Sequence, residues 1–383
     1  VEPGEYIHFG LEESIVEVLL QFPNTSLPNQ LEIDFNTDGC NLDKSGNIHI
    51  WPIQCRLANI RHTKPIIGIY RGASKPNNPN TFFEKFITDI KKIFNNGGIS
   101  ARGKKCSIIL RCFIADAHAF ILNHRSHISN KPCSKCKVSD TWCEGRNIFR
   151  GVNHLLRTNE EYVTCNDEDH HKEGRSPLES LPFGMVSQVP LEYMHLVCLG
   201  VMKKLLSAWV CGKYSRLSKL PARSISIMSK RLETLKTYCP SDFARRPKSL
   251  DTYTKYKATE LRQFLLYTGP VVTYGILDQQ LYTHFLFLHV AIKILVSTSP
   301  SEAYLKFADL ALKKFVDRCE SLYGATFNSY NIHGLLHLTD DVRQLDSLDS
   351  FSAFPYENNM TFFRKYCRKP NLPLQQIFKR MAE

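Results

Sequence analysis

The sequence predicts an α/β core interrupted by a large, mostly α-helical insertion. Its first third alternates β-rich segments with one amphipathic helical pattern, and a polar stretch rich in cysteine and histidine follows. Long helical patterns then continue almost to the C-terminus. The chain has 383 residues, of which 43% are hydrophobic and 22% charged. This composition is typical of a globular protein large enough for two or three domains.

The first β-rich segments read as three successive strands. The segment QLEIDFNTDG, residues 30–39, predicts a strand that runs into a turn containing Asp38. Two more strands are expected in residues 47–59 and 64–72, separated by polar, turn-forming residues. This arrangement predicts the beginning of one sheet.

A helix and a fourth strand complete the first third. Residues 78–98 place Phe82, Phe86 and Ile90 at helical spacing and end in Asn-Asn-Gly-Gly. Residues 105–116 form a long β-rich run that ends at Asp116. Three strands, a helix and a fourth strand, in that order, are the first part of an RNase H-like layout.

The remaining chain changes character after Asp116. Residues 118–182 are polar and lack clear periodicity, whereas helical patterns dominate from about residue 190. The longest apolar run, residues 285–296, is too short for a bilayer span and contains two polar side chains, so we expect a buried helix. The expected organisation is a lead-in segment (1–29), the first part of the core (30–117), the insertion (118–349) and a C-terminal core helix (350–383).

A surplus of positive charge favours a polyanionic partner. The formal net charge is +12, and the stretch from Lys203 to Arg262 holds fifteen Lys and Arg residues against four acidic ones. Such a stretch is either a solvated basic face or a surface that follows phosphates. From charge clustering alone, we select Arg245, Arg246 and Lys248 as candidate phosphate contacts.

Thirteen scattered cysteines and the lack of a recognisable signal peptide indicate a reducing compartment. Cys133 and Cys136 form a CxxC pair, which is half of a typical tetrahedral zinc site. The best second half is His333 and His337, whose spacing places both imidazoles on one helix face. Local alternatives with irregular spacing are His124, His127, Cys143, Cys165, His170 and His171.

Three acidic residues are candidates for a second metal site. Asp38 and Asp116 end the first and fourth predicted strands, which are neighbours in an RNase H-like sheet. Glu357 lies on a predicted helix after the insertion. Converging carboxylates of this kind bind two Mg²⁺ or Mn²⁺ ions that promote chemistry at a phosphodiester.

The order of these motifs resembles DDE-type cut-and-paste transposases of the CACTA (En/Spm) group within the CMC superfamily. The segments NTDGCNL and FIADAHAF are similar to the motifs of the first and second catalytic Asp. PCSKC, EYMHLVCLGVMKKLL, HGLLHLTDDV and AFPYENNM resemble the family's later motifs. The catalytic subunit of the V(D)J recombinase is similar in arrangement.

The resemblance implies a nuclear, metal-dependent enzyme that cleaves and joins DNA at transposon ends. It implies double-stranded DNA as partner, a dimer or larger assembly, no membrane association, and a structural Zn²⁺. His195 also falls on a family motif, either as a core histidine or as a DNA contact. The sequence departs from many members of this family after the second Asp. Those members carry Pro-Ala-Arg there, whereas this chain has Ala117 and His118 and lacks the arginine.

Two other interpretations stay open, and a third lacks a required motif. A zinc nucleobase deaminase shares the Pro-Cys-x-x-Cys half-site but needs an upstream His-x-Glu, which this chain lacks. A transposon-derived host protein could bind DNA or proteins without catalysis. The last hypothesis is a helical protein that is held together by zinc and has no nucleic-acid role. It requires that the acidic triad and the positive charge both arose by chance.

Overall fold

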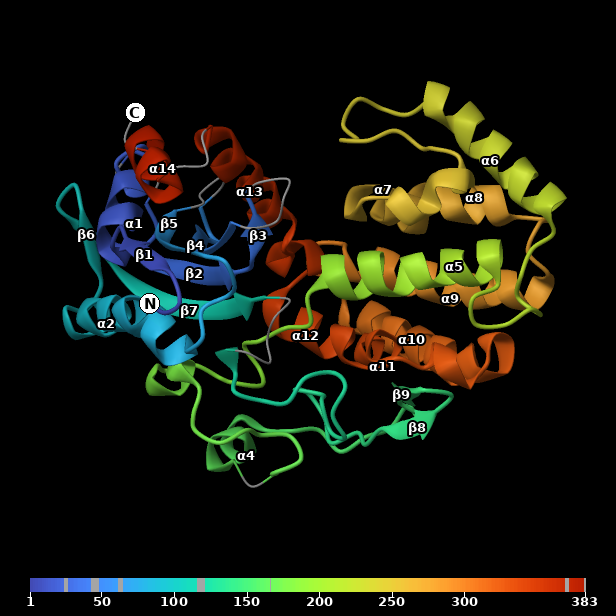
Figure 1. Cartoon of the computed structure of the whole chain (residues 1–383), viewed down its shortest axis with the longest axis horizontal. Helices are drawn as coiled ribbons and strands as arrows, with labels where there is room; N and C mark the ends of the chain where they lie inside the picture. Colours follow the sequence, from blue (N-terminus) through green and yellow to red (C-terminus); the bar gives the residue numbers. More distant parts are fainter. Residues whose placement is uncertain are drawn as a thin grey trace. The chain divides into compact units, whose positions relative to one another are not determined.

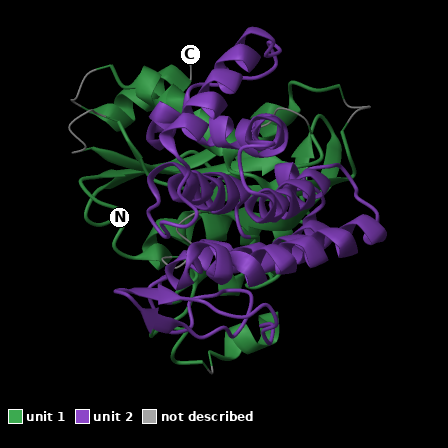
Figure 2. Cartoon of the chain, turned by 90° about the vertical axis from the view of Figure 1, so that its right-hand side faces the viewer, with its two compact units in different colours: residues 1–124, 158–190, 351–383 green, residues 125–157, 191–350 purple. Residues whose placement is uncertain are grey.

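A computed structural model of the chain divides into two compact units (Figure 2). Unit 1 contains residues 1–124, 158–190 and 351–383, and unit 2 contains residues 125–157 and 191–350. The protein is mixed α/β. The structure describes residues 1–23, 27–42, 48–60, 65–115, 121–165, 167–368 and 372–381.

Unit 1 is built on a mixed sheet whose strand order is β1-β5-β4-β2-β7-β6, with the short β3 paired to β4 (Figure 1). β2 lies between β4, to which it is antiparallel, and β7, to which it is parallel. The strands are β1 (Glu5–His8), β2 (Gln30–Thr37), β3 (Cys40–Asn41), β4 (His49–Leu57), β5 (Ile66–Gly72), β6 (Ile99–Ala101) and β7 (Lys104–Ile114).

All four predicted strands of the first third are present, as β2, β4, β5 and β7. Most of their apolar residues are buried, as expected for strands of a covered sheet. The expected lead-in segment also contributes structure, because it contains β1 and helix α1 (Leu11–Leu19). β1 pairs with β5 and thereby extends the sheet.

The predicted helix is α2 (Pro79–Asn95), and its apolar face is buried against the sheet. The side chain of Asn78 caps the helix by accepting a hydrogen bond from the backbone N–H of Asn80. The helix ends before Gly98, which has a φ of +128°. A Cβ there would lie 2.1 Å from the carbonyl oxygen of Cys106, so this turn requires glycine.

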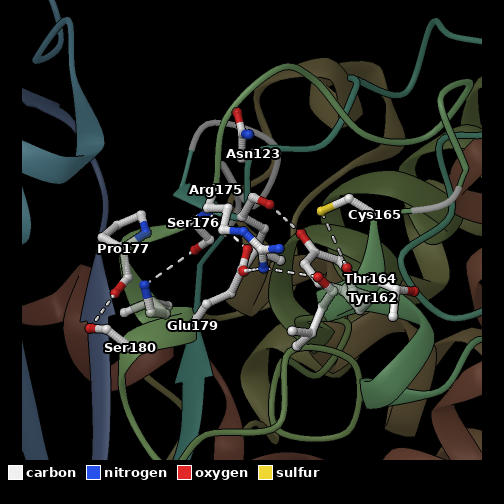
Figure 3. Close-up of polar contacts among 12 residues, drawn as sticks. Asn123, Tyr162, Thr164, Cys165, Arg175, Ser176, Pro177, Glu179 and Ser180 are labelled. Carbon is white, nitrogen blue, oxygen red and sulfur yellow. Dashed lines mark hydrogen bonds and ion pairs between the residues drawn. The ribbon is translucent and has the colours of Figure 1, made fainter.

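Residues 158–190, which the sequence analysis assigned to the insertion, pack within unit 1. Tyr162 and several apolar residues near position 185 join the same core as α2. Polar contacts of Ser176 and Tyr162, both labelled in Figure 3, fix this segment. The Ser176 hydroxyl donates to the carbonyl of Ile121 at 2.8 Å, and the Tyr162 hydroxyl donates to that of Leu122. Arg175 pairs with Glu179 at 2.8 Å.

The C-terminal part of unit 1 consists of α13 (Phe354–Tyr366) and α14 (Pro373–Met381). Met360, Phe363 and Ile377 from these helices form a separate apolar cluster with Ile50 of β4 and Ile69 of β5. The predicted C-terminal helix therefore packs directly on the sheet.

Unit 2 is mostly helical, and its longest helices, α9 and α10, pack against each other. The apolar run 285–296 lies in α9, where Leu288 and Ile292 are fully buried, so the prediction of a buried helix is confirmed. The main elements are a hairpin of β8 (Thr141–Cys143) and β9 (Arg146–Ile148), the π-helix η3 (Met194–Met202), and helices α5 (Lys203–Cys211), α6 (Ala222–Thr237), α7 (Ala258–Gln263), α8 (Gly269–Thr273), α9 (Gln279–Leu295), α10 (Glu302–Tyr323), α11 (Tyr330–Gly334) and α12 (Leu338–Leu345).

Among the described residues, one helical stretch, Met194–Cys211, is long and apolar enough to cross a membrane. Just over half of it, 56%, is buried inside the protein. A core helix of a water-soluble protein passes the same test, so this stretch is weak evidence for a membrane span.

Candidate metal centres

Four side chains of unit 2 converge on one buried point: Cys133, Cys136, His333 and His337. The Cys136 sulfur lies 3.3 Å from Nε2 of His333, the Cys133 sulfur lies 3.5 Å from Nε2 of His337, and the two Nε2 atoms are 3.2 Å apart. A tetrahedron with ordinary Zn–S and Zn–N bonds of about 2.3 and 2.0 Å has ligand–ligand edges of about 3.3–3.8 Å. This group could therefore bind a structural metal such as zinc.

The local fold positions both halves of the group. An isolated antiparallel β-bridge between the backbones of Cys136 and Leu156 holds the CxxC turn. The Arg157 Nε also donates to the carbonyl oxygens of Cys133 and Cys136, at 3.0 and 3.1 Å. His333 lies in α11, and His337 ends a single 3₁₀ turn that connects α11 with α12. The predicted helical HxxxH pair is thus present, with a tightened turn between its two histidines.

The surroundings of the group are buried and largely apolar. Val138, Phe149 and Tyr330 pack around the two cysteines. The backbone N–H of Lys135 lies 3.4 Å from the Cys133 sulfur, in position to stabilise a thiolate. Burial opposes ionisation of Cys133, but its contacts with Cys136 and the two histidines outweigh burial and lower its pKa.

A buried ion pair fastens the same two segments beside the metal ligands. The Lys135 ammonium lies 2.6 Å from the carboxylate of Asp341, which also accepts a hydrogen bond from the backbone N–H of Leu191. Both side chains of the pair are less than a tenth exposed. Burial raises the pKa of Asp341, while Lys135 opposes that rise.

The alternative ligands named from the sequence lie elsewhere. His124, His170 and His171 gather in unit 1, where neighbouring imidazole centroids are 4.9 Å apart. Cys143 is in β8 of unit 2, and Cys165 follows helix α4 (Asn159–Thr164) in unit 1. Among the residues with a described placement, these side chains form no four-ligand group of the kind seen at Cys133.

A second candidate centre lies in unit 1, where Asp38 and Glu357 meet. Their carboxylate oxygens lie within 4.8 Å of each other, and both residues are partly buried. Asp38 directly follows β2, and its carboxylate accepts a hydrogen bond of 2.6 Å from the backbone N–H of Gly39. Glu357 lies in the first turn of α13, where the helix dipole favours a negative charge.

The thiol of Cys40 lies within the electrostatic influence of both carboxylates. Its pKa is raised to about 11, first by burial and then by the negative charges of Glu357 and Asp38, while Arg364 opposes the rise. Two carboxylates this close repel each other, and a bound cation relieves that repulsion. Carboxylate oxygens are the ligands that hard divalent ions prefer.

A chain of buried amides, which the sequence analysis missed, holds α13 against the sheet. Asn359 donates to the Gln54 side chain of β4 at 2.8 Å, and Gln54 contacts the Asn36 side chain of β2 at 3.4 Å. Asn36 in turn donates to the carbonyl of Ile114, the last residue of β7, at 2.6 Å. Only the joint burial of these amides identifies the chain, because their spacing in the sequence follows no motif.

Asp34 precedes Asp38 by four residues but has a different environment. Its carboxylate is fully buried in β2 between the guanidinium groups of Arg56 and Arg111, at 2.5 and 2.6 Å. Cys112 donates a further hydrogen bond to it. Asp34 is therefore committed to an internal ion-pair network, whereas Asp38 faces Glu357.

The remaining predicted site residues are distributed over both units. Asp116 lies outside the described residues; β7 ends two residues before it in the sequence. His195 is in η3 of unit 2, where its Nδ1 lies 2.8 Å from the Glu192 carboxylate. The carboxylate also accepts hydrogen bonds from the backbone N–H groups of Met194 and His195, so it caps the start of this helix.

The three residues predicted to contact phosphate differ in their ion pairing. The Lys248 ammonium pairs with the buried Glu260 carboxylate at 2.7 Å, so this lysine serves a structural role. Arg245 and Arg246 are exposed, and neither has a carboxylate partner within the described part of unit 2.

Comparison with known proteins adds no family assignment. No protein-family model matches the sequence, and no curated protein matches it.

Proposed function

We propose that the protein is a DDE-type DNA transposase whose Asp38, Asp116 and Glu357 bind the divalent ions for DNA cleavage and strand transfer. The observation that carries the proposal is the meeting of Asp38 and Glu357. They stand at opposite ends of the sequence, yet their carboxylate oxygens come within 4.8 Å.

The strand arrangement supports an RNase H-like core. β2 is parallel to β7, and Asn36 is paired with Ile114, so the two strands end at the same edge of the sheet. Asp38 follows the first of these strands and Asp116 the second in the sequence. The antiparallel β4 and β5 continue the sheet on the other side of β2, in the order expected for this layout.

The chain's own residues would perform two tasks in the reaction. Asp38 and Glu357 supply negative oxygens that bind and orient the ions, and the amide chain through Asn359 keeps α13 in register with β2. Bound Mg²⁺ or Mn²⁺ supplies activation of a water or a 3′-hydroxyl and stabilisation of the leaving oxygen. The Cys133 group is a structural zinc site within unit 2, separate from this chemistry.

The test is a nicking and strand-transfer assay on plasmid DNA and on DNA ends, with Mg²⁺ or Mn²⁺. Asp38→Asn, Asp116→Asn and Glu357→Gln should each lower product formation by about a thousandfold or more, because the three groups act as a unit. Glu17→Gln, which changes an exposed residue of α1, serves as the control.

A wild-type protein that binds DNA but gives no product under any metal condition would contradict the proposal. The alternative, a transposon-derived DNA- or protein-binding protein without catalysis, would then take its place.

A further inference from the structure

Three cations of unit 2 converge on the ring of Tyr214. The Lys204 ammonium lies 4.7 Å from the ring centroid, the Lys213 ammonium 5.8 Å, and the Arg146 guanidinium carbon 6.0 Å. They come from three places in the sequence: α5, the loop after it, and β9 of the hairpin. We call Arg146, Lys204, Lys213 and Tyr214 the Tyr214 cluster.

Aromatic rings packed against Tyr214 hold the cluster in place. The fully buried Phe327 lies edge-on to Tyr214, with centroids 5.3 Å apart, and the Lys204 ammonium is 4.9 Å from the Phe327 ring. Phe327 is itself stacked on Tyr323 of α10 at 4.3 Å. The rings hold the ammonium of Lys204 in a defined place while Arg146 and Lys213 remain exposed.

The charges of the cluster are not balanced by neighbouring acids. Within the described residues, no carboxylate forms an ion pair with Arg146, Lys204 or Lys213. The nearby Glu320 is already paired with Arg150 at 2.8 Å. The pKa of Lys204 is lowered to about 7, first by burial and then by the positive charges of Arg146 and Lys213.

We propose that the Tyr214 cluster binds a phosphate group, with Arg146, Lys204 and Lys213 as its three donors. An anion between like charges relieves their repulsion, and a phosphate accepts hydrogen bonds from a guanidinium and two ammonium groups at once. The choice of a DNA backbone phosphate as the main source rests on the proposed function. Free phosphate or a nucleotide has the same chemistry, and the test separates these sources.

The experiment measures binding of a fluorescent DNA duplex by anisotropy over a series of salt concentrations, without added Mg²⁺ or Mn²⁺, so that no cleavage occurs and the zinc of unit 2 is retained. Lys213→Glu and Lys204→Met should weaken binding about five- to tenfold and reduce the salt slope by about one phosphate contact. Lys306→Glu changes an exposed lysine of α10 and matches the charge change of Lys213→Glu. Zinc content and the unfolding midpoint of each variant establish that it is folded.

A second arm measures the rise in unfolding temperature that inorganic phosphate causes. Loss of DNA affinity in the cluster variants, beyond that of Lys306→Glu, supports a backbone phosphate. Unchanged DNA affinity with a lost phosphate effect supports a free phosphate or nucleotide. If the cluster variants behave like Lys306→Glu in both arms, the proposal is wrong. Binding is measured without added Mg²⁺ or Mn²⁺, so this result does not depend on whether the protein cleaves DNA.

Discussion

Asp34 and Asp38 stand four positions apart in the sequence, yet their surroundings give them different properties. Asp34 is enclosed by two arginines and fully buried, while Asp38 lies beyond the strand end and meets Glu357. The sequence favoured Asp38 because it ends the predicted strand, and the structure supplies the reason that Asp34 is unsuitable. A carboxylate already saturated by two guanidinium groups has little capacity left for a metal ion.

His284 makes the stability of unit 2 sensitive to acid. Its ring is fully buried in α9, stacked on Phe315 with centroids 4.1 Å apart, and its Nε2 donates to the Phe315 carbonyl at 2.8 Å. Burial lowers its pKa to about 4 from an ordinary value of 6.5. The neutral form is therefore the one that the folded state accepts.

As the pH falls, the unfolded chain takes up this proton at a higher pH than the folded protein does. The stabilising contribution is therefore complete above pH 6.5, is lost progressively below that value, and is gone once the pH has fallen through 4. We expect the free energy of unfolding to fall by about 2 kcal/mol between pH 7 and pH 5 from this residue alone. Urea unfolding at a series of pH values checks this, with His284→Phe as the variant that cannot titrate. An identical pH slope in the variant would show that another group is responsible.

The register of α13 on the sheet depends on the amide chain that begins at Asn359. Removing its side chain leaves the buried Gln54 amide without this partner, which costs about 1–3 kcal/mol. We expect Asn359→Ala to lower the free energy of unfolding by that amount and to slow DNA cleavage by displacing Glu357. The neighbouring Asn358 is exposed, so Asn358→Ala is a matched control. Equal cleavage rates in the two variants would argue against a positioning role.

Secondary-structure elements could be predicted where the apolar residues recur periodically or form a continuous run, and they were missed where no such pattern is present. The strands β2, β4, β5 and β7 and the helix α2 carry continuous or periodic apolar residues, so their type could be read directly. β1 is only four residues long, and residues 158–190 are polar and aperiodic, so the former was missed and the latter was assigned to the insertion. The amide chain and the Tyr214 cluster depend on tertiary contacts, which a single sequence does not reveal.

The Cys133 group joins distant parts of unit 2, and we expect it to control the stability of that unit as a whole. The purified chain should contain one zinc ion, and Cys136→Ser should lose it and unfold at a midpoint lower by about 10 °C. Elemental analysis and thermal unfolding measure the two effects. Cys143→Ser, a change in the neighbouring hairpin, should retain the metal. Full zinc content in Cys136→Ser would remove Cys136 from the ligand set.

The central claim is that Asp38 and Glu357 bind a divalent ion together. Its most direct test is a Mn²⁺ titration of the zinc-loaded protein monitored by electron paramagnetic resonance. The titration compares wild type with Asp38→Asn, Glu357→Gln and the control Glu17→Gln, which changes an exposed residue of α1. The proposal predicts bound Mn²⁺ that Mg²⁺ displaces, with affinity about tenfold or more weaker in the first two variants and unchanged in the control. Equal Mn²⁺ binding in all four proteins would contradict it.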